Sequence, residues 1–225
     1  MAIKNYISFK VRRSKIIALY FFLLLSGTLY SQRFSAGLSG GITATQVGGD
    51  ALGGFDKPGA TVGGFVSTSF SKNWSAQFEI LYVQKGSKGV GDSLPYPYST
   101  SSYGGYYLMS LQYLEVPLLL SYHYKKFQVE TGPSIGFLIG ASETTLYKTE
   151  NTLSTFSRLE LAYSIGANYP LGKNFYLNLR FSNSVLPIRQ PAGVVSYPSF
   201  IYTGQYNTVL LLSLRYYFFS ENQEK

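Results

Sequence analysis

The sequence of 225 residues has no cysteine, one histidine and two methionines. Without cysteine the chain can form no disulfide bond, no thiolate zinc site, no thiol nucleophile and no N-terminal lipoprotein anchor. One histidine and two methionines also leave few side chains for a transition-metal site. We therefore expect no metal, no cofactor and no catalytic residue set.

Charged residues are also scarce, at 13% of the chain, and the mean hydropathy is +0.03. Beyond the N-terminus no apolar run reaches the roughly 18 residues of a transmembrane helix, which excludes a helical membrane protein. What is abundant is tyrosine, with 21 residues, and phenylalanine, with 16. Aromatic residues together with glycine, serine and threonine favour β-strands.

The first 31 residues predict a secretory signal peptide. Five Lys and Arg residues lie within 1–15, an apolar segment follows at 16–25, and the small residue Ser31 precedes Gln32. The alternative is an uncleaved membrane anchor, for which the apolar segment is short. Removing the five basic residues lowers the formal net charge from +8 to +3, so nucleic acid is not an expected partner.

Eight segments alternate between apolar and polar residues with a period of two, which predicts β-strands. Their ranges are 33–45, 59–71, 74–86, 106–124, 127–140, 158–170, 174–186 and 205–219. The connections alternate in length: they are short at 71–73, 124–126 and 171–174, and long at 46–58, 87–105, 141–157 and 188–204. This rhythm, with an even number of long strands, predicts an all-β, eight-stranded, antiparallel up-and-down transmembrane barrel and not a soluble sandwich. We expect one barrel domain at 32–225, located in the cell outer membrane.

The alternation also assigns each strand residue to an outer or an inner face. The outer face is apolar, and beside the short connections it carries Trp74, Tyr124, Phe127, Tyr169, Phe175, Tyr216 and Phe218. Aromatic side chains at that level form the interfacial girdle of a membrane barrel. We expect outer-membrane lipid to contact this face.

The stretch YLEVPLLLSYHYKKFQVETGP, residues 113–133, places carboxylates inside apolar runs. Its alternation directs these carboxylates into the lumen, where an unpaired charge is very costly. We predict a structural luminal network of Glu79, Glu115, Glu130, Glu160, Arg180 and Arg215. A proton or ion path and a ligand or catalytic constellation are the alternatives. Pro117 cannot donate to a closed sheet, so we expect a β-bulge near it.

Two long connections, 86–107 and 189–204, are rich in Tyr, Ser and Gly, a composition that suits adaptable recognition surfaces. The candidate recognition residues are Tyr96, Tyr98, Tyr103, Tyr197, Phe200 and Tyr202. The alternative is that both loops pack on each other over the mouth of the barrel.

The segment YLEVPLLLSYHYKKFQVETGPSIGFLIG resembles the middle hairpin of the PorT-like outer-membrane β-barrel family common in Bacteroidetes. The matching residues are Tyr113, Leu114, Glu115, Pro117, Leu118, Leu119, Gly132, Pro133 and Gly136. The resemblance implies an eight-stranded barrel of a Gram-negative outer membrane, without catalytic residues to carry over. Some members of that family serve secretion or gliding systems, so the resemblance makes such a role one expectation for this chain. The six residues after Phe219 depart from the family's aromatic-ended last strand.

These patterns favour a non-enzymatic barrel that acts as a scaffold or binds a protein partner in the outer membrane or periplasm through its long loops. One alternative is a small-solute pore or transport barrel. Another is a lipid-modifying enzyme, for which His123, Ser121 and Glu115 share the luminal face. Fold alone does not decide among the three.

Overall fold

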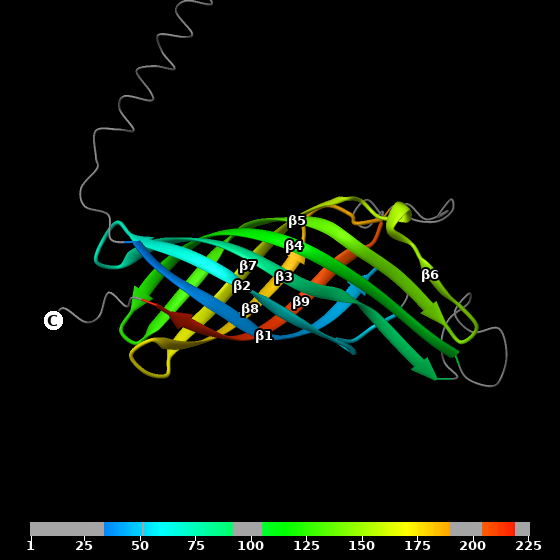
Figure 1. Cartoon of the computed structure of the whole chain (residues 1–225), viewed down its shortest axis with the longest axis horizontal. Coiled ribbons are helices and arrows are strands. Elements are labelled where there is room, and N and C mark those ends of the chain that lie inside the picture. Colours follow the sequence, from blue (N-terminus) through cyan, green and yellow to red (C-terminus); the bar gives the residue numbers. More distant parts are fainter. Residues whose placement is uncertain (1–33, 51, 92–104, 190–203, 219–225) are drawn as a thin grey trace, which may run out of the picture. The chain divides into compact units, whose positions relative to one another are not determined.

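The computed structural model describes residues 34–50, 52–91, 105–189 and 204–218. All of them lie in the second of the two units into which the chain divides, Phe34–Lys225. The strands are β1 (Phe34–Gly48), β2 (Lys57–Ser69), β3 (Trp74–Gly91), β4 (Gly105–Tyr124), β5 (Phe127–Thr145), β6 (Thr149–Asn151), β7 (Leu159–Pro170), β8 (Phe175–Ser184) and β9 (Tyr206–Tyr217), with a short 3₁₀ helix at Leu153–Thr155 (Figure 1). No helix in these ranges has the length and apolar character needed to cross a membrane.

Eight of the strands close into a ring. Each strand pairs antiparallel with its neighbour in the order β1, β2, β3, β4, β5, β7, β8, β9, and β9 pairs back to β1 from Gly37↔Tyr217 to Gly48↔Tyr206. Closure leaves no free edge along the shared length of the strands, so their backbone amides and carbonyls are satisfied within the sheet. The predicted eight-stranded, antiparallel up-and-down barrel is confirmed.

The strands β3, β4 and β5 run further toward the long connections than the alternation indicated. The expected loop at 141–157 in fact contains the last residues of β5, the strand β6 and the 3₁₀ helix. The strand β6 pairs only with the outer end of β5, from Ser142↔Asn151 to Thr144↔Thr149. The sequence of this hairpin lacks the apolar–polar alternation that predicts a strand, because both of its faces are largely open to water.

The three short connections lie at one end of the barrel, here called the short-turn end, and the long connections lie at the other, the long-loop end. The seven aromatic side chains expected beside the short connections are all exposed on the outer face. Neighbouring rings touch: centroids are 4.9 Å apart for Trp74 and Tyr122, 5.4 Å for Phe127 and Tyr169, and 5.0 Å for Phe175 and Tyr216. The outer face therefore ends in an aromatic band at the short-turn end.

Pro117 interrupts a ladder without shifting it. The β3–β4 pairs stop at Phe78↔Leu118 and resume at Leu81↔Glu115 in the same register. The register shift between β4 and β5 lies instead at Gln112/Tyr113. The expectation of a bulge near the proline is thus wrong in position, because the missing N–H removes one local pairing and needs no extra residue.

Candidate functional site: the charged lumen

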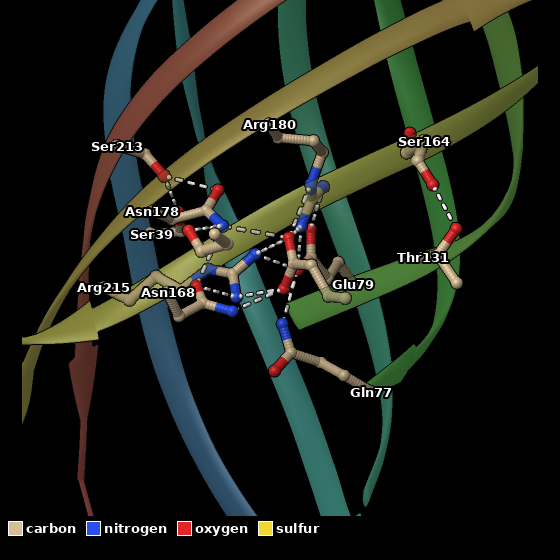
Figure 2. A network of polar contacts seen from close by, with 12 residues as sticks. Ser39, Gln77, Glu79, Thr131, Ser164, Asn168, Asn178, Arg180, Ser213 and Arg215 are labelled. Carbon is tan, nitrogen blue, oxygen red and sulfur yellow. Dashed lines mark hydrogen bonds and ion pairs between the residues drawn. The ribbon is translucent and has the colours of Figure 1, made fainter. Parts of the chain in front are cut away.

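Two glutamates and two arginines from four different strands meet inside the barrel. Figure 2 labels three of them, Glu79, Arg180 and Arg215. The guanidinium of Arg180 on β8 donates two hydrogen bonds to Glu79 on β3, at 2.8 and 2.7 Å, and its Nε donates to Glu130 on β5 at 2.9 Å. Arg215 on β9 donates to Glu130 Oε2 and to Glu79 Oε1, both at 2.8 Å. The two positive and two negative charges balance, and their bonds tie four strands together across the lumen.

Carboxamide side chains complete this set, here called the central network. Asn168 Nδ2 donates to Glu130 Oε2 at 2.8 Å, and Asn178 Nδ2 donates to Glu130 Oε1 at 2.9 Å. Arg215 also donates to Asn168 Oδ1 at 2.8 Å. Glu130 therefore accepts bonds from two arginines and two asparagines while its side chain is 0% exposed. Bonds of this kind offset the desolvation of a buried carboxylate.

A second charged cluster lies nearer the long-loop end. Lys85 on β3 is 3.0 Å from Glu115 on β4 and 3.0 Å from Glu160 on β7. Its ammonium also lies 4.9 Å from the centroid of the Tyr113 ring. All three charged side chains are buried, so this lysine clamp joins three strands at a second level of the lumen.

Glycines opposite the glutamates make room for these charges. Gly136 pairs with Glu115 on one side and Glu160 on the other, and a Cβ there would come within 3.1 Å of the Tyr113 ring. Gly166 pairs with Glu130, and a Cβ there would lie 3.0 Å from its Oε1. Gly136 and Gly166 thus have a packing role in the lumen.

Apolar side chains fill the lumen on either side of the charges. Toward the long-loop end, a buried cluster is formed by Val47, Tyr107, Met109, Leu111, Tyr113, Leu138, Ala141, Phe156 and Ile188. Toward the short-turn end, the Tyr217 ring packs on Phe65 with centroids 4.7 Å apart and on Tyr176 at 5.0 Å. An eight-stranded barrel has an interior just wide enough for such side chains.

The six residues of the expected luminal network all lie inside the barrel, but as two groups. Glu79, Glu130, Arg180 and Arg215 form the central network, and Glu115 and Glu160 bind Lys85. Lys85 is not in the predicted network, because residue 85 lies at the end of the predicted strand 74–86, whereas β3 continues to Gly91. Arg158, which directly precedes β7, is exposed.

The candidate recognition residues Tyr96, Tyr98, Tyr103, Tyr197, Phe200 and Tyr202 lie outside the described residues. At the long-loop end, the described part of the chain holds a partly exposed ion pair in which Arg189 Nη1 lies 3.0 Å from Glu143 Oε1. Asp50 is buried nearby and accepts hydrogen bonds from Ser87 and from the Leu52 N–H. Burial raises the pKa of Asp50, and these two hydrogen bonds act against that rise.

The histidine is not joined to the serine that a hydrolytic constellation would use. His123 Nε2 lies 2.9 Å from Ser75 Oγ, whereas Ser121 Oγ has no hydrogen-bond partner among the described residues. Glu115 is held by Lys85. No group of three or more His, Cys, Asp or Glu side chains in the described ranges could hold a metal ion.

A closed antiparallel barrel with an apolar outer face and a polar, charge-paired interior defines the class of integral outer-membrane β-barrels. The chain belongs to the outer membrane protein β-barrel domain family, whose model matches residues 28–188. It is therefore a protein of the cell outer membrane, in contact with lipid along its outer face.

The solved structures that are similar to this chain include two bacterial proteins. Ail, the attachment invasion locus protein of Yersinia pestis, determined in complex with the heparin analogue sucrose octasulfate, is 14% identical, with a TM-score of 0.46 over 83% of this chain and 99% of that chain. Neisserial surface protein A is 10% identical, with a TM-score of 0.48 over 83% and 99%. No protein of curated function matches the chain in sequence.

Proposed function

We propose that this protein is a non-enzymatic outer-membrane scaffold with a closed lumen, and that it binds a protein partner through its long-loop end. The observation that carries the proposal is the central network, in which every charge is paired and four strands are joined. A conducting lumen needs mobile water and exposed polar groups. A fully paired set behind apolar clusters instead supports a rigid plug.

The resemblance to PorT-like barrels suggests the kind of assembly that the proposed scaffold serves. Some members of that group serve secretion or gliding systems, and the hairpin that carries the resemblance holds Glu115 and Glu130 here. Both glutamate side chains lie in the lumen of this barrel, where they form ion pairs. The resemblance therefore concerns the architecture of the barrel interior. We propose that the partner contacts lie in the loops of the long-loop end.

Residues 1–31 are part of the proposal as a cleaved export signal, with the mature barrel domain at 32–225. Sequencing the N-terminus of the protein purified from outer membranes tests this step. A mature chain that starts near Gln32 supports it. A chain that retains residues 16–25 would show an uncleaved anchor.

The closed lumen is tested by recording from purified protein in planar bilayers. We expect no steady, reproducible conductance steps from the wild-type barrel. The matched variant R180Q/R215Q removes both arginines from the lumen and serves as the perturbed control. Regular steps from the wild type would overturn the closed lumen.

The loop role is tested by site-specific photo-crosslinking in native outer membranes. A crosslinker at Tyr147, which is 82% exposed at the β5–β6 hairpin, should trap one stoichiometric partner. A crosslinker at Leu212, on the lipid-facing surface of β9, is the matched control. Equal products from the two positions, or none from either, would count against a partner at this end.

A small-solute pore is the second candidate, favoured by one observation. Several buried luminal groups have no hydrogen-bond partner among the described residues, including the hydroxyls of Ser164 and Ser182. Buried polar groups of this kind are commonly satisfied by internal water. The conductance measurement separates static water from a continuous path.

A further inference from the structure

The short-turn end of the barrel carries a concentration of positive charge. Each of its three turns contributes lysine, and the four side chains, Lys72, Lys125, Lys126 and Lys173, are all exposed. We call these four the basic rim. None of them forms an ion pair with another described residue.

Acidic residues are placed elsewhere in the described part of the chain. Four carboxylates face the lumen and are paired there: Glu79, Glu115, Glu130 and Glu160. The other four, Asp50, Asp56, Glu143 and Glu150, lie at the long-loop end. Among the described residues, the charge of the basic rim is therefore of one sign, and no described carboxylate neutralises it.

The basic rim lies at the level of the aromatic band. Lys125 and Lys126 stand between Tyr124 and Phe127, and Lys173 is two residues from Phe175. Aromatic side chains at a strand end mark the level of the lipid headgroups. The lysine ammonium groups are therefore within reach of phosphate groups and not of hydrocarbon.

The backbone of the turn at Lys125 is a separate indication that a lysine is needed at this position. Its φ of 55° is the only positive value among the described non-glycine residues. Glycine or asparagine adopts that conformation more readily, so the turn keeps a lysine where the backbone would favour another residue. Its ammonium lies 5.4 Å from the centroid of the Tyr124 ring, which directs it along the barrel wall toward the headgroup level.

We propose that the basic rim binds the headgroups of anionic phospholipids, such as phosphatidylglycerol, in preference to zwitterionic headgroups. A lysine close to an anionic membrane surface strengthens association about fivefold, and the effect decays within the Debye length of about 8 Å at physiological salt. The rim thus selects the lipid around the short-turn end and fixes the depth of the barrel there.

The single tryptophan of the chain is a reporter in the right place. Trp74 is exposed in the aromatic band, two residues from Lys72, and contacts Tyr122 on β4, which leads into the turn with Lys125 and Lys126. Brominated lipids quench tryptophan on contact. We would reconstitute the barrel in vesicles that contain brominated phosphatidylglycerol or brominated phosphatidylcholine in the same overall lipid mixture, and excite Trp74 selectively.

The expected result is a two- to fivefold higher association of phosphatidylglycerol than of phosphatidylcholine next to Trp74, which weakens as NaCl is raised from 50 to 500 mM. The variant K72Q/K125Q/K126Q should bring the ratio close to one. The matched control K88Q/K148Q removes two lysines at the long-loop end and should keep the wild-type ratio. Both leaflets carry the same lipids, so the orientation of insertion does not affect the readout.

Two outcomes would overturn the proposal. One is equal quenching by both lipids in the wild type, which would assign the lysines to an acidic protein surface instead. The other is an unchanged preference in K72Q/K125Q/K126Q. Because the wild-type salt series needs no substitution, the proposal stays open to refutation even where a variant inserts poorly.

Discussion

Replacing Glu130 with glutamine is the sharpest perturbation of the central network. The substitution keeps the shape of the side chain and removes one charge from a set of two glutamates and two arginines. It leaves Arg180 and Arg215 to share Glu79. Its new amide group also meets other donors, which are those of Arg180 and Asn178 if it takes the Oε1 position or those of Arg215 and Asn168 if it takes the Oε2 position. Glu130 is fully buried, so solvent screening does not reduce the energetic cost of removing its charge.

Removing one partner from a buried ion pair destabilises a protein by about 3–5 kcal/mol. We expect E130Q to lower the free energy of unfolding by an amount in that range. The measurement is reversible urea unfolding in lipid vesicles, followed by tryptophan fluorescence and by the mobility shift of the folded barrel in gels.

The matched control is E150Q, which breaks the exposed ion pair of Lys148 and Glu150 at the long-loop end. Exposed pairs contribute about 0–1 kcal/mol, so this variant should unfold like the wild type. If E130Q and E150Q had the same small effect, the central network would not stabilise the barrel. A double-mutant cycle with R215Q should then also show no coupling between positions 130 and 215.

Three further predictions follow from the same geometry. K85M leaves Glu115 and Glu160 without their cation and should destabilise the barrel by about 3–5 kcal/mol in urea unfolding, while K85M/E115Q/E160Q should recover part of that loss. G136A should lower stability by about 1–3 kcal/mol, since its Cβ meets the Tyr113 ring at 3.1 Å, whereas G40A meets nothing within 4 Å and should unfold like the wild type. Burial raises the pKa of Asp50, so its charged form opposes folding above that pKa. D50N should therefore be more stable than the wild type at pH 7, by a margin that shrinks as the pH falls toward 4; a constant margin would contradict this.

The fold was accessible from the sequence because a barrel strand has a strict period of two. Alternation gave the faces of β7 and β8, and the contrast of short and long connections gave the up-and-down order. The aromatic band could be predicted for the same reason, because each of its members lies next to a short turn. The strand ends at the long-loop side were less well predicted, since β3 and β5 continue through polar residues that carry no alternation.

The charged lumen was predictable only as a set of residues. The period of two places Glu79, Glu130, Arg180 and Arg215 inside without saying which carboxylate meets which guanidinium. The partners are 50 to 136 residues apart in sequence. Which side chains meet depends on the stagger between strands, and every strand pair around the ring contributes its own register to that stagger.

The sequence by itself determined the class of protein, the faces of the strands and the sign of the charges on them, because these follow from local spacing. Only the tertiary structure decided that the charges divide into a balanced central network and a separate lysine clamp. It also decided that Arg180 and Arg215 each reach both Glu79 and Glu130. Both are consequences of ring closure, which brings residues from distant parts of the chain into contact through backbone pairing and barrel stagger.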